Sequence, residues 1–219
     1  MQFFSIFLLT TSWIGYFLIH SLTASNGFKG KINSLFPFAT KYYRLGYNTL
    51  AVFLLIPPIY ILYKHEWEQL WQWGGYYSWI QLLLGLGSIL GFLLTLRTYG
   101  GMEFMGISQV LSSSEEKHNE TLHISDFHRY VRHPWYFLAL VLLWSRDMNL
   151  GLLITAIFIT LYFIVGSRLE EKKLILEFGD RYAKYCDKVP GLIPLPWKFL
   201  NKKQALALTA NTHGDKKTD

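Results

Sequence analysis

The sequence predicts an all-α integral membrane protein with about five transmembrane helices and a cytoplasmic C-terminal amphipathic helix. Hydrophobic residues make up 51% of the 219 residues and aromatic residues 17%, which fits a lipid-facing surface better than a water-facing one. Residues 1–28, 45–63, 76–96 and 148–167 contain no Asp, Glu, Lys or Arg. Because about 20 apolar residues span the hydrocarbon core of a bilayer, each of these segments predicts a transmembrane helix.

Two of the predicted helices need a further argument. The alternative for the first segment is a cleaved signal peptide. Such a peptide usually begins with basic residues, and "MQFFSIFLLTTSW" has none, so we expect a retained helix. The fifth candidate, residues 134–145, is too short to cross alone at about 1.5 Å per residue. It is therefore the weakest span, and it needs flanking residues or a hairpin partner.

The basic residues predict the orientation. Lys and Arg number 4, 1, 4 and 1 in the four successive connections and 11 from Arg168 onward. The positive-inside rule then places the N-terminus outside and the third connection and the C-terminus in the cytoplasm. We expect a bacterial inner membrane protein with a cytoplasmic site. The net charge of +6 indicates contact with a membrane surface, and no nucleic-acid partner is expected.

The chain is predicted to form one transmembrane domain over residues 1–200, followed by a mobile polar tail over residues 201–219. The single cysteine, Cys186, excludes an internal disulfide and a cysteine-rich zinc site. We expect no metal.

Polar residues gather at the entrance of the fifth candidate, in "HRYVRHPWYFLALVLLW" at residues 128–144. Pro134 fits the first turn of a helix, which places His133 just before it. A helix entrance favours an anionic group such as a ligand carboxylate. The alternative is that these residues are only interfacial anchors, with Trp135 and Tyr136 in the aromatic belt.

Two carboxylates, Glu170 and Glu171, directly follow the last uncharged segment. Acidic residues at a membrane boundary are costly unless they face a cavity or pair with a base. The alternative is ordinary solvation at a helix end, with Arg168 or Lys172 as partners. An amphipathic helix is predicted next, from the 3, 4, 3 spacing of Ile175, Phe178, Tyr182 and Tyr185.

These pieces together resemble a known family. "RHPWY", followed by "EEKKLILEFGDRYAKYCDKVPGLIP", is similar to the C-terminal pattern of the isoprenylcysteine carboxyl methyltransferase superfamily of integral-membrane methyltransferases, over about residues 121–194. Three further pieces resemble the branch with the NnrU proteins and the methanethiol S-methyltransferases: "HSLTAS", "YRLGYN" and "MEFMGISQV".

The resemblance implies a site for S-adenosylmethionine. His128 stands where the family usually has an aromatic residue, and Tyr130 is a substitute for it. The chemistry agrees, because a helix entrance suits the donor's carboxylate, a glutamate suits its ribose hydroxyls and aromatic faces suit its sulfonium. The implied cofactor-binding residues are Glu120, Thr121, Leu122, His123, His128, Tyr130, His133, Pro134, Trp135, Tyr136 and either Glu170 or Glu171.

The resemblance also implies a methyl acceptor, and the branch favours a small or membrane-partitioning thiol. We expect His20, Gln109 and Arg168 to be catalytic, with Arg44 a further candidate to face the acceptor. Methyl transfer is an in-line displacement that needs alignment and exclusion of water rather than a metal. The alternatives are an isoprenylcysteine-type carboxyl or lipid methyltransferase, a sterol-type NADPH reductase, and a non-catalytic NnrU-like accessory protein.

Overall fold

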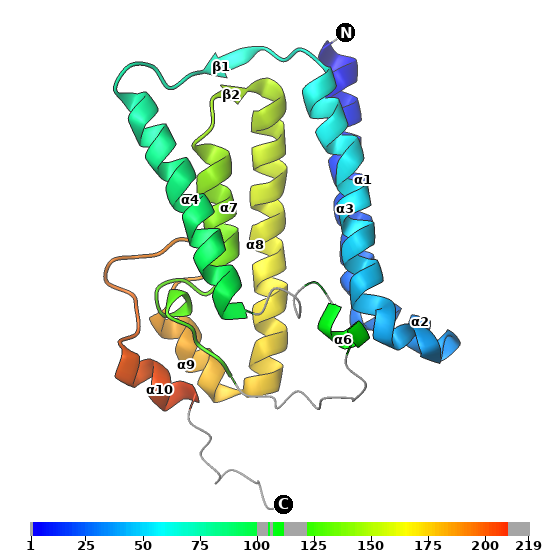
Figure 1. Ribbon diagram of the computed structural model, residues 1–219, viewed down its shortest axis with the longest axis vertical. Helices are drawn as coiled ribbons and strands as arrows, with labels where there is room; N and C mark the ends of the chain where they lie inside the picture. Colours follow the sequence, from blue (N-terminus) through cyan, green and yellow to red (C-terminus); the bar gives the residue numbers. More distant parts are fainter. Residues whose placement is uncertain (1, 100–104, 106, 112–121, 210–219) are drawn as a thin grey trace, which may run out of the picture. The chain divides into compact units, whose positions relative to one another are not determined.

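The computed structural model describes residues 2–99, 105, 107–111 and 122–209, and for residues 39, 97–99, 108 and 109 only the backbone. These residues are mostly helical, which confirms the predicted all-α class (Figure 1). The elements are α1 (Gln2–Ala24), α2 (Asn26–Leu35), η1 (Pro37–Tyr42), α3 (Tyr43–Lys64), β1 (Gln69–Trp71), α4 (Tyr77–Tyr99), α6 (Ile107–Leu111), η2 (Phe127–Arg129), α7 (Pro134–Trp144), β2 (Met148–Asn149), α8 (Leu150–Phe178), α9 (Asp180–Lys188) and α10 (Lys202–Thr209).

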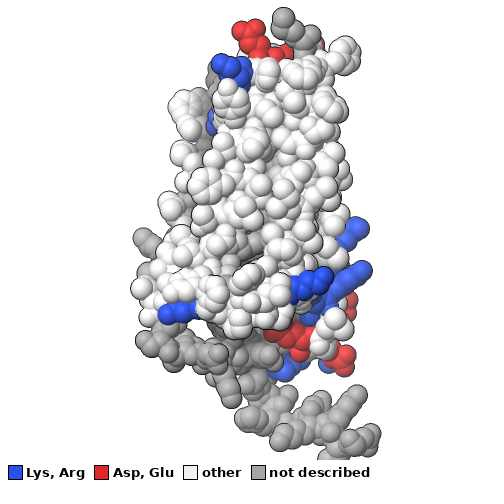
Figure 2. Space-filling model, turned by 90° about the vertical axis from the view of Figure 1, so that its right-hand side faces the viewer, with Lys and Arg blue, Asp and Glu red and all other residues white. Residues whose placement is uncertain are grey.

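Four helical segments of the described residues are long and apolar enough to cross a membrane, as the uncharged segments predict. They are Gln2–Ala24, Thr40–Lys64, Tyr77–Leu96 and Leu150–Phe178. The middle of the face drawn in Figure 2 shows no charged side chain among the residues described, as a lipid-facing surface requires. The fifth candidate, α7, has 11 residues, about 16 Å at 1.5 Å per residue. It is the short apolar helix that the sequence predicts as the weakest span.

The chain divides into two compact units, and the first contains residues 1–115 and 141–162. In this unit α1 packs along α3 (Figure 1). The indole Nε1 of Trp13 donates a hydrogen bond to Thr155 Oγ1 on α8 (3.1 Å). The short strands β1 and β2 pair antiparallel, with Gln69 opposite Asn149.

The second unit contains residues 116–140 and 163–219. Its core gathers the buried side chains of Leu122, Tyr182, Tyr185, Val189, Leu200 and Ala205. The predicted amphipathic helix is interrupted at Gly179, where a φ of +58° ends α8 and starts α9, a conformation that favours glycine. Tyr182 and Tyr185 are buried as predicted, whereas Ile175 is 40% exposed.

Residues 202–209 form α10 rather than an unstructured tail, which corrects the expectation for the first half of that segment. The Asn201 side chain accepts from the Gln204 amide, and the Gln204 side chain accepts from the Asn201 amide (2.8 and 2.9 Å). This reciprocal pair is a capping box that starts a helix. Ala205 and Leu208 then pack against the core of the second unit.

Candidate active site

Arg132 is the centre of a polar network in the second unit. Its Nε donates to Glu171 Oε1 (2.8 Å) and its Nη2 to Glu171 Oε2 (3.0 Å), so the guanidinium and the carboxylate form a two-bond fork. Its Nη1 donates to the backbone oxygens of Cys186 and Val189. Burial alone would lower the pKa of Arg132, but the hydrogen bond and charge of Glu171 raise it above its usual value, so Arg132 is a permanent cation.

The backbone of the RHP motif is fixed by the segment that follows α9. The Arg132 amide donates to the Pro190 oxygen (2.9 Å), and the His133 amide donates to the Gly191 oxygen (3.0 Å). A Cβ on Gly191 would lie 3.3 Å from Arg132 Nη2 and 3.5 Å from Glu171 Oε1, so the glycine leaves room for the ion pair. The "RHP" and "VPG" segments are thus in contact although they are far apart in the sequence.

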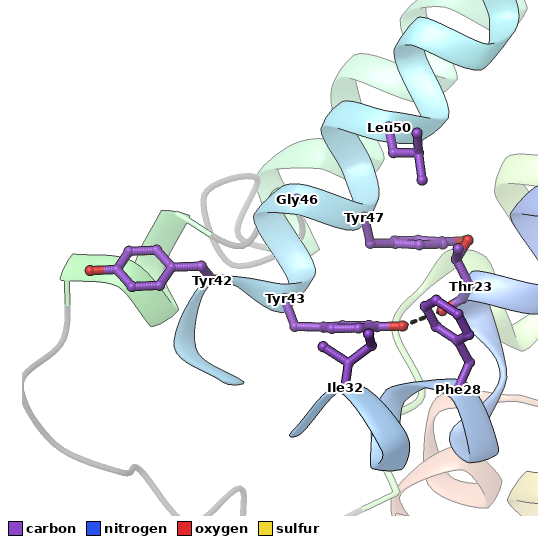
Figure 3. Close-up of a pocket in the computed structure, with 8 residues that line it drawn as sticks. All are labelled: Thr23, Phe28, Ile32, Tyr42, Tyr43, Gly46, Tyr47 and Leu50. Carbon is purple, nitrogen blue, oxygen red and sulfur yellow. Dashed lines mark hydrogen bonds between the residues drawn. The ribbon is translucent and has the colours of Figure 1, made fainter. Parts of the chain in front are cut away.

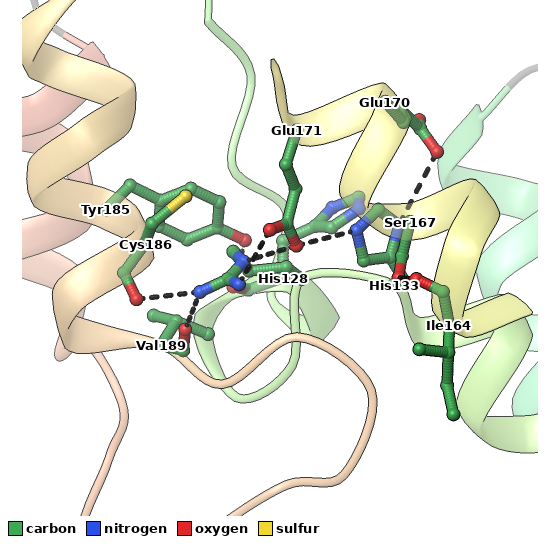
Figure 4. A network of polar contacts seen from close by, with 10 residues as sticks. His128, His133, Ile164, Ser167, Glu170, Glu171, Tyr185, Cys186 and Val189 are labelled. Carbon is green, nitrogen blue, oxygen red and sulfur yellow. Dashed lines mark hydrogen bonds and ion pairs between the residues drawn. The ribbon is translucent and has the colours of Figure 1, made fainter. Parts of the chain in front are cut away.

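The imidazole of His133 lies between the two carboxylates of α8 (Figure 4). Its Nε2 donates to Glu171 Oε1 (3.0 Å), and its Nδ1 lies 3.5 Å from Glu170 Oε2. The two glutamates differ in exposure, because the side chain of Glu171 is 16% exposed and that of Glu170 is 52% exposed. Glu171 is thus occupied by Arg132 and His133, whereas Glu170 presents much of its carboxylate to the surroundings.

The length of α8 explains the depth of these carboxylates. Glu170 lies 20 residues after Leu150, the first residue of the helix, which is about 30 Å along the axis. That distance equals the thickness of the hydrocarbon core. A helix that crosses the membrane from Leu150 therefore brings both carboxylates to the boundary, where a partner such as Arg132 is required.

An aromatic column continues from His133. The imidazole stacks on Tyr136 (centroids 5.3 Å apart, 9° between planes), and Tyr136 stacks on Phe163 of α8 (4.3 Å, 5°). Pro134 is buried and begins α7, which confirms the predicted place of the motif at a helix entrance.

His128 is built into the loop before the motif. Its Nδ1 lies 3.0 Å from Ser125 Oγ, and its backbone oxygen accepts a hydrogen bond from the Tyr185 hydroxyl (2.7 Å). Burial, and then the charge of nearby His133, lower the pKa of His128 to about 4. His128 is therefore neutral at physiological pH and holds this loop against α9.

Other predicted cofactor residues take more varied places. Tyr130 is 47% exposed and stacks on Phe199 (5.8 Å). Leu122 lies in the core of the second unit, and His123 is exposed. Trp135 is half-buried in the first turn of α7. Glu120 and Thr121 lie outside the described residues.

The candidate catalytic residues divide between the two units. Arg168 is exposed on the part of α8 that belongs to the second unit, while His20 and Gln109 belong to the first. Gln109 lies in α6, where only its backbone is described, and Arg44 is exposed at the start of α3.

His20 sits in a cluster of aromatic hydroxyl groups within the first unit. Its Nε2 lies 2.8 Å from the Tyr47 hydroxyl, and its ring stacks on Tyr16 (5.4 Å). The next residue, Ser21, pairs its hydroxyl with that of Tyr162 on α8 (3.2 Å). Such a cluster positions an imidazole and gives it a partner for proton exchange.

The three loosely matched pieces of the sequence meet in this unit. Tyr43 and Tyr47 of "YRLGYN" reach the Thr23 oxygen and His20 of "HSLTAS". Asn48 Nδ2 of the same piece donates to the Met105 oxygen of "MEFMGISQV" (3.1 Å). Asn48 and Met105 are 57 positions apart, so pieces that are distant in the sequence are brought together in this unit.

Sequence reasoning missed the role of Arg132, which it treated only as a possible interfacial anchor. The sequence contained a signal for this role. Arg132 directly precedes His133, and the carboxylates of Glu170 and Glu171 at the membrane boundary require a basic partner. Among the described residues no group of His, Cys, Asp or Glu side chains could hold a metal ion.

Several curated proteins that are similar to the chain are named methanethiol S-methyltransferases. The chain is 36% identical over 104 residues to methanethiol S-methyltransferase of Crocosphaera subtropica, covering 46% of the chain and 39% of that protein. It is 29% identical over 185 residues to methanethiol S-methyltransferase 2 of Bradyrhizobium diazoefficiens, covering 80% and 68%. The chain is similar to the methanethiol S-methyltransferases.

A third relative is the methanethiol S-methyltransferase of Pseudomonas sp. strain GM41(2012), 28% identical over 152 residues, which cover 66% of the chain and 57% of that protein. The matches thus span about two fifths of the Crocosphaera methanethiol S-methyltransferase and just over half of this one. No family model and no solved structure matches the chain. The relatives' names confirm the resemblance to membrane methyltransferases and support an enzyme role.

Proposed function

We propose that the chain is an S-adenosylmethionine-dependent integral-membrane methyltransferase that methylates the sulfur of a small or membrane-partitioning thiol. The observation that carries this proposal is the network of Arg132, His133, Glu170 and Glu171 at the entrance of α7. It supplies a cation, an imidazole and one largely accessible carboxylate on a framework that the residues after α9 hold in place. The names of the methanethiol S-methyltransferase relatives support the thiol as acceptor.

The residues fit the donor's functional groups. S-adenosylmethionine supplies, when bound, a methyl group on a sulfonium sulfur, together with a carboxylate and ribose hydroxyls. His133, at the positive end of the α7 dipole, suits the carboxylate. The Glu170 carboxylate, 52% exposed, suits the hydroxyls.

The structure favours different tasks for the two glutamates. Glu171 accepts three hydrogen bonds, two from Arg132 and one from His133, so its task is to position these two side chains. Glu170 is the carboxylate we assign to the cofactor. This assignment leaves the ion pair intact when the cofactor binds.

The acceptor must lose its thiol proton before its sulfur attacks the methyl carbon, because the thiolate is the nucleophile. We propose that His20 accepts this proton. The Tyr47 hydroxyl, 2.8 Å from His20 Nε2, orients the ring. S-adenosylmethionine, when bound, would supply the methyl group with its sulfonium sulfur as the leaving group, so that the acceptor thiolate would become a methyl thioether and the donor sulfur a neutral thioether. Gln109 in the first unit and Arg168 in the second stay predicted catalytic residues.

Cofactor binding tests the assignment of the glutamates. We expect Glu170→Gln and His133→Ala each to weaken binding of labelled S-adenosylmethionine about thirtyfold, the equivalent of about 2 kcal/mol for one charged hydrogen bond. Glu177→Gln, an exposed glutamate on the same helix, is the matched control. Unchanged affinity in Glu170→Gln would contradict the assignment, and tight NADPH binding instead would indicate a reductase.

Turnover tests the acceptor. The purified protein should methylate methanethiol or a related thiol, with a rate that rises with pH toward the thiol pKa. His20→Ala should reduce turnover more than cofactor affinity. Methylation of a prenylcysteine carboxylate or a lipid amine, with no thiol product, would remove the thiol assignment, and no methylation at all would favour an accessory protein.

The proposed orientation has the N-terminus outside and the site in the cytoplasm, in a bacterial inner membrane. Single cysteines introduced at Lys64 and Asn201, in a Cys186→Ser background, should react with a membrane-impermeant maleimide from opposite sides. Labelling of both from the outside would contradict five crossings.

A further inference from the structure

A cavity of about 310 Å³ lies in the first unit, where α1 ends, α2 follows and α3 begins. Figure 3 shows Tyr43 and Tyr47 projecting from α3 toward Thr23 and Phe28. The volume is at the lower end of the range for ligand pockets, about 300–1,000 Å³. The first unit therefore contains space for a ligand, whereas the network around Arg132 belongs to the second unit.

The lining of this cavity is almost entirely apolar. Its wall on α2 is formed by Phe28 and Ile32, and its wall on α3 by the tyrosine rings and Gly46. The Tyr43 hydroxyl is turned to the Thr23 backbone oxygen, so its ring rather than its polar atom faces the space. An apolar lining binds hydrocarbon and gives little to a polar molecule.

Basic side chains flank the cavity on both helices. Lys29 follows Phe28 and Lys31 precedes Ile32, so at 100° per residue the two lysines lie on either side of the apolar stripe of α2. Lys41 and Arg44 lie next to the tyrosines at the start of α3, and all four side chains are exposed. Residues 1–65 contain no Asp or Glu, so no acidic side chain of this segment balances them.

We propose that this cavity binds one anionic membrane phospholipid, with an acyl chain among Phe28, Ile32 and the tyrosines and the phosphate beside the basic residues. Charge complementarity identifies the headgroup, because a zwitterionic lipid gains less from four cations that no acidic side chain of residues 1–65 balances. The apolar lining identifies the chain. The cavity also adjoins helices long and apolar enough to cross a membrane, which is where such a lipid is available.

Gly46 offers a way to fill the cavity without disturbing the helix. A Cβ on Gly46 meets no atom within 4 Å, and leucine has a better helix propensity than glycine. Gly46→Leu therefore places a side chain in the cavity. Gly85→Leu is the matched control, because Gly85 is a helical glycine of α4 with the same open surroundings.

Native mass spectrometry of the full chain, titrated in detergent with phosphatidylglycerol or phosphatidylcholine, tests the proposal. We expect one phosphatidylglycerol to bind preferentially, and Gly46→Leu to lose this adduct while Gly85→Leu keeps it. Lys29→Gln with Lys31→Gln should weaken phosphatidylglycerol binding about twentyfivefold, fivefold for each charge of about 1 kcal/mol. The same double change should leave phosphatidylcholine binding unaltered.

A second pair of exposed lysines, Lys172 and Lys173 on α8, provides the charge control. Changing both to glutamine should leave the phosphatidylglycerol adduct in place. Equal binding of phosphatidylglycerol and phosphatidylcholine would overturn the proposal. So would an equal loss of the phosphatidylglycerol adduct in the two double lysine variants. An adduct that survives in a folded Gly46→Leu variant would show that the lipid lies elsewhere.

Discussion

Replacement of Arg132 by leucine should destabilise the second unit strongly. Glu171 has a side chain only 16% exposed and would lose both hydrogen bonds of the guanidinium fork. Breaking a buried ion pair from one side costs about 3–5 kcal/mol, because the remaining charge is left without compensation. Arg132→Lys keeps the charge but loses the fork, and should cost about 1.5–3 kcal/mol.

The partner substitution separates pairing from general damage. Glu171→Leu alone leaves the guanidinium with the Cys186 and Val189 oxygens, so we expect a smaller loss. The double leucine variant removes both charges and should recover about 2–3 kcal/mol relative to the sum of the single changes.

The free energy of unfolding in detergent micelles, followed by circular dichroism against denaturant, measures these differences. If the loss of stability in the double variant equalled the sum of the two single losses within about 0.5 kcal/mol, Arg132 and Glu171 would not stabilise the fold as a pair. Wild-type stability in Arg132→Leu would refute the reasoning outright.

Three further predictions concern the same unit. The free energy of unfolding should fall by up to about 3 kcal/mol as the pH drops from 6.5 to 4. The reason is that His128 gains a proton near its ordinary pKa in the unfolded chain, whereas its pKa in the folded protein is about 4. In His128→Asn, the free energy of unfolding should depend less on pH over the same range. Gly191→Ala should lower the thermal midpoint, at a cost of about 1–3 kcal/mol, because the new methyl group meets the Arg132 guanidinium at 3.3 Å. Burial mainly raises the pKa of the Cys186 thiol, and the charge of Glu171 raises it further, so Glu171→Gln should speed maleimide labelling of this single cysteine at pH 7; an unchanged rate would contradict that coupling.

The features predicted correctly from the sequence are those that depend on neighbouring residues. Uncharged segments define membrane helices because the bilayer thickness sets their length. Pro134 identifies the start of α7 because proline fits the first turn of a helix. The spacing of Tyr182 and Tyr185 predicts that both are buried, since helical periodicity determines which face packs.

Other features depend on residues that are distant along the chain. The pairing of Arg132 with Glu171 joins residues 39 positions apart, and no local pattern specifies which base balances which carboxylate. The break at Gly179 was concealed because the amphipathic pattern continues across it. The capping box of Asn201 and Gln204 was a local signal, but the polar composition around it favoured a tail.

The connection between the loop before α7 and the last residues of the second unit has a consequence for synthesis. Leu200 donates its amide to the Arg129 oxygen and accepts from the Arg129 side chain (both 2.9 Å), across 71 positions. During translation the RHP motif therefore leaves the ribosome long before its supports exist. The candidate cofactor site can close only after residue 200 has emerged, so a truncation before that point should yield inserted helices without the site.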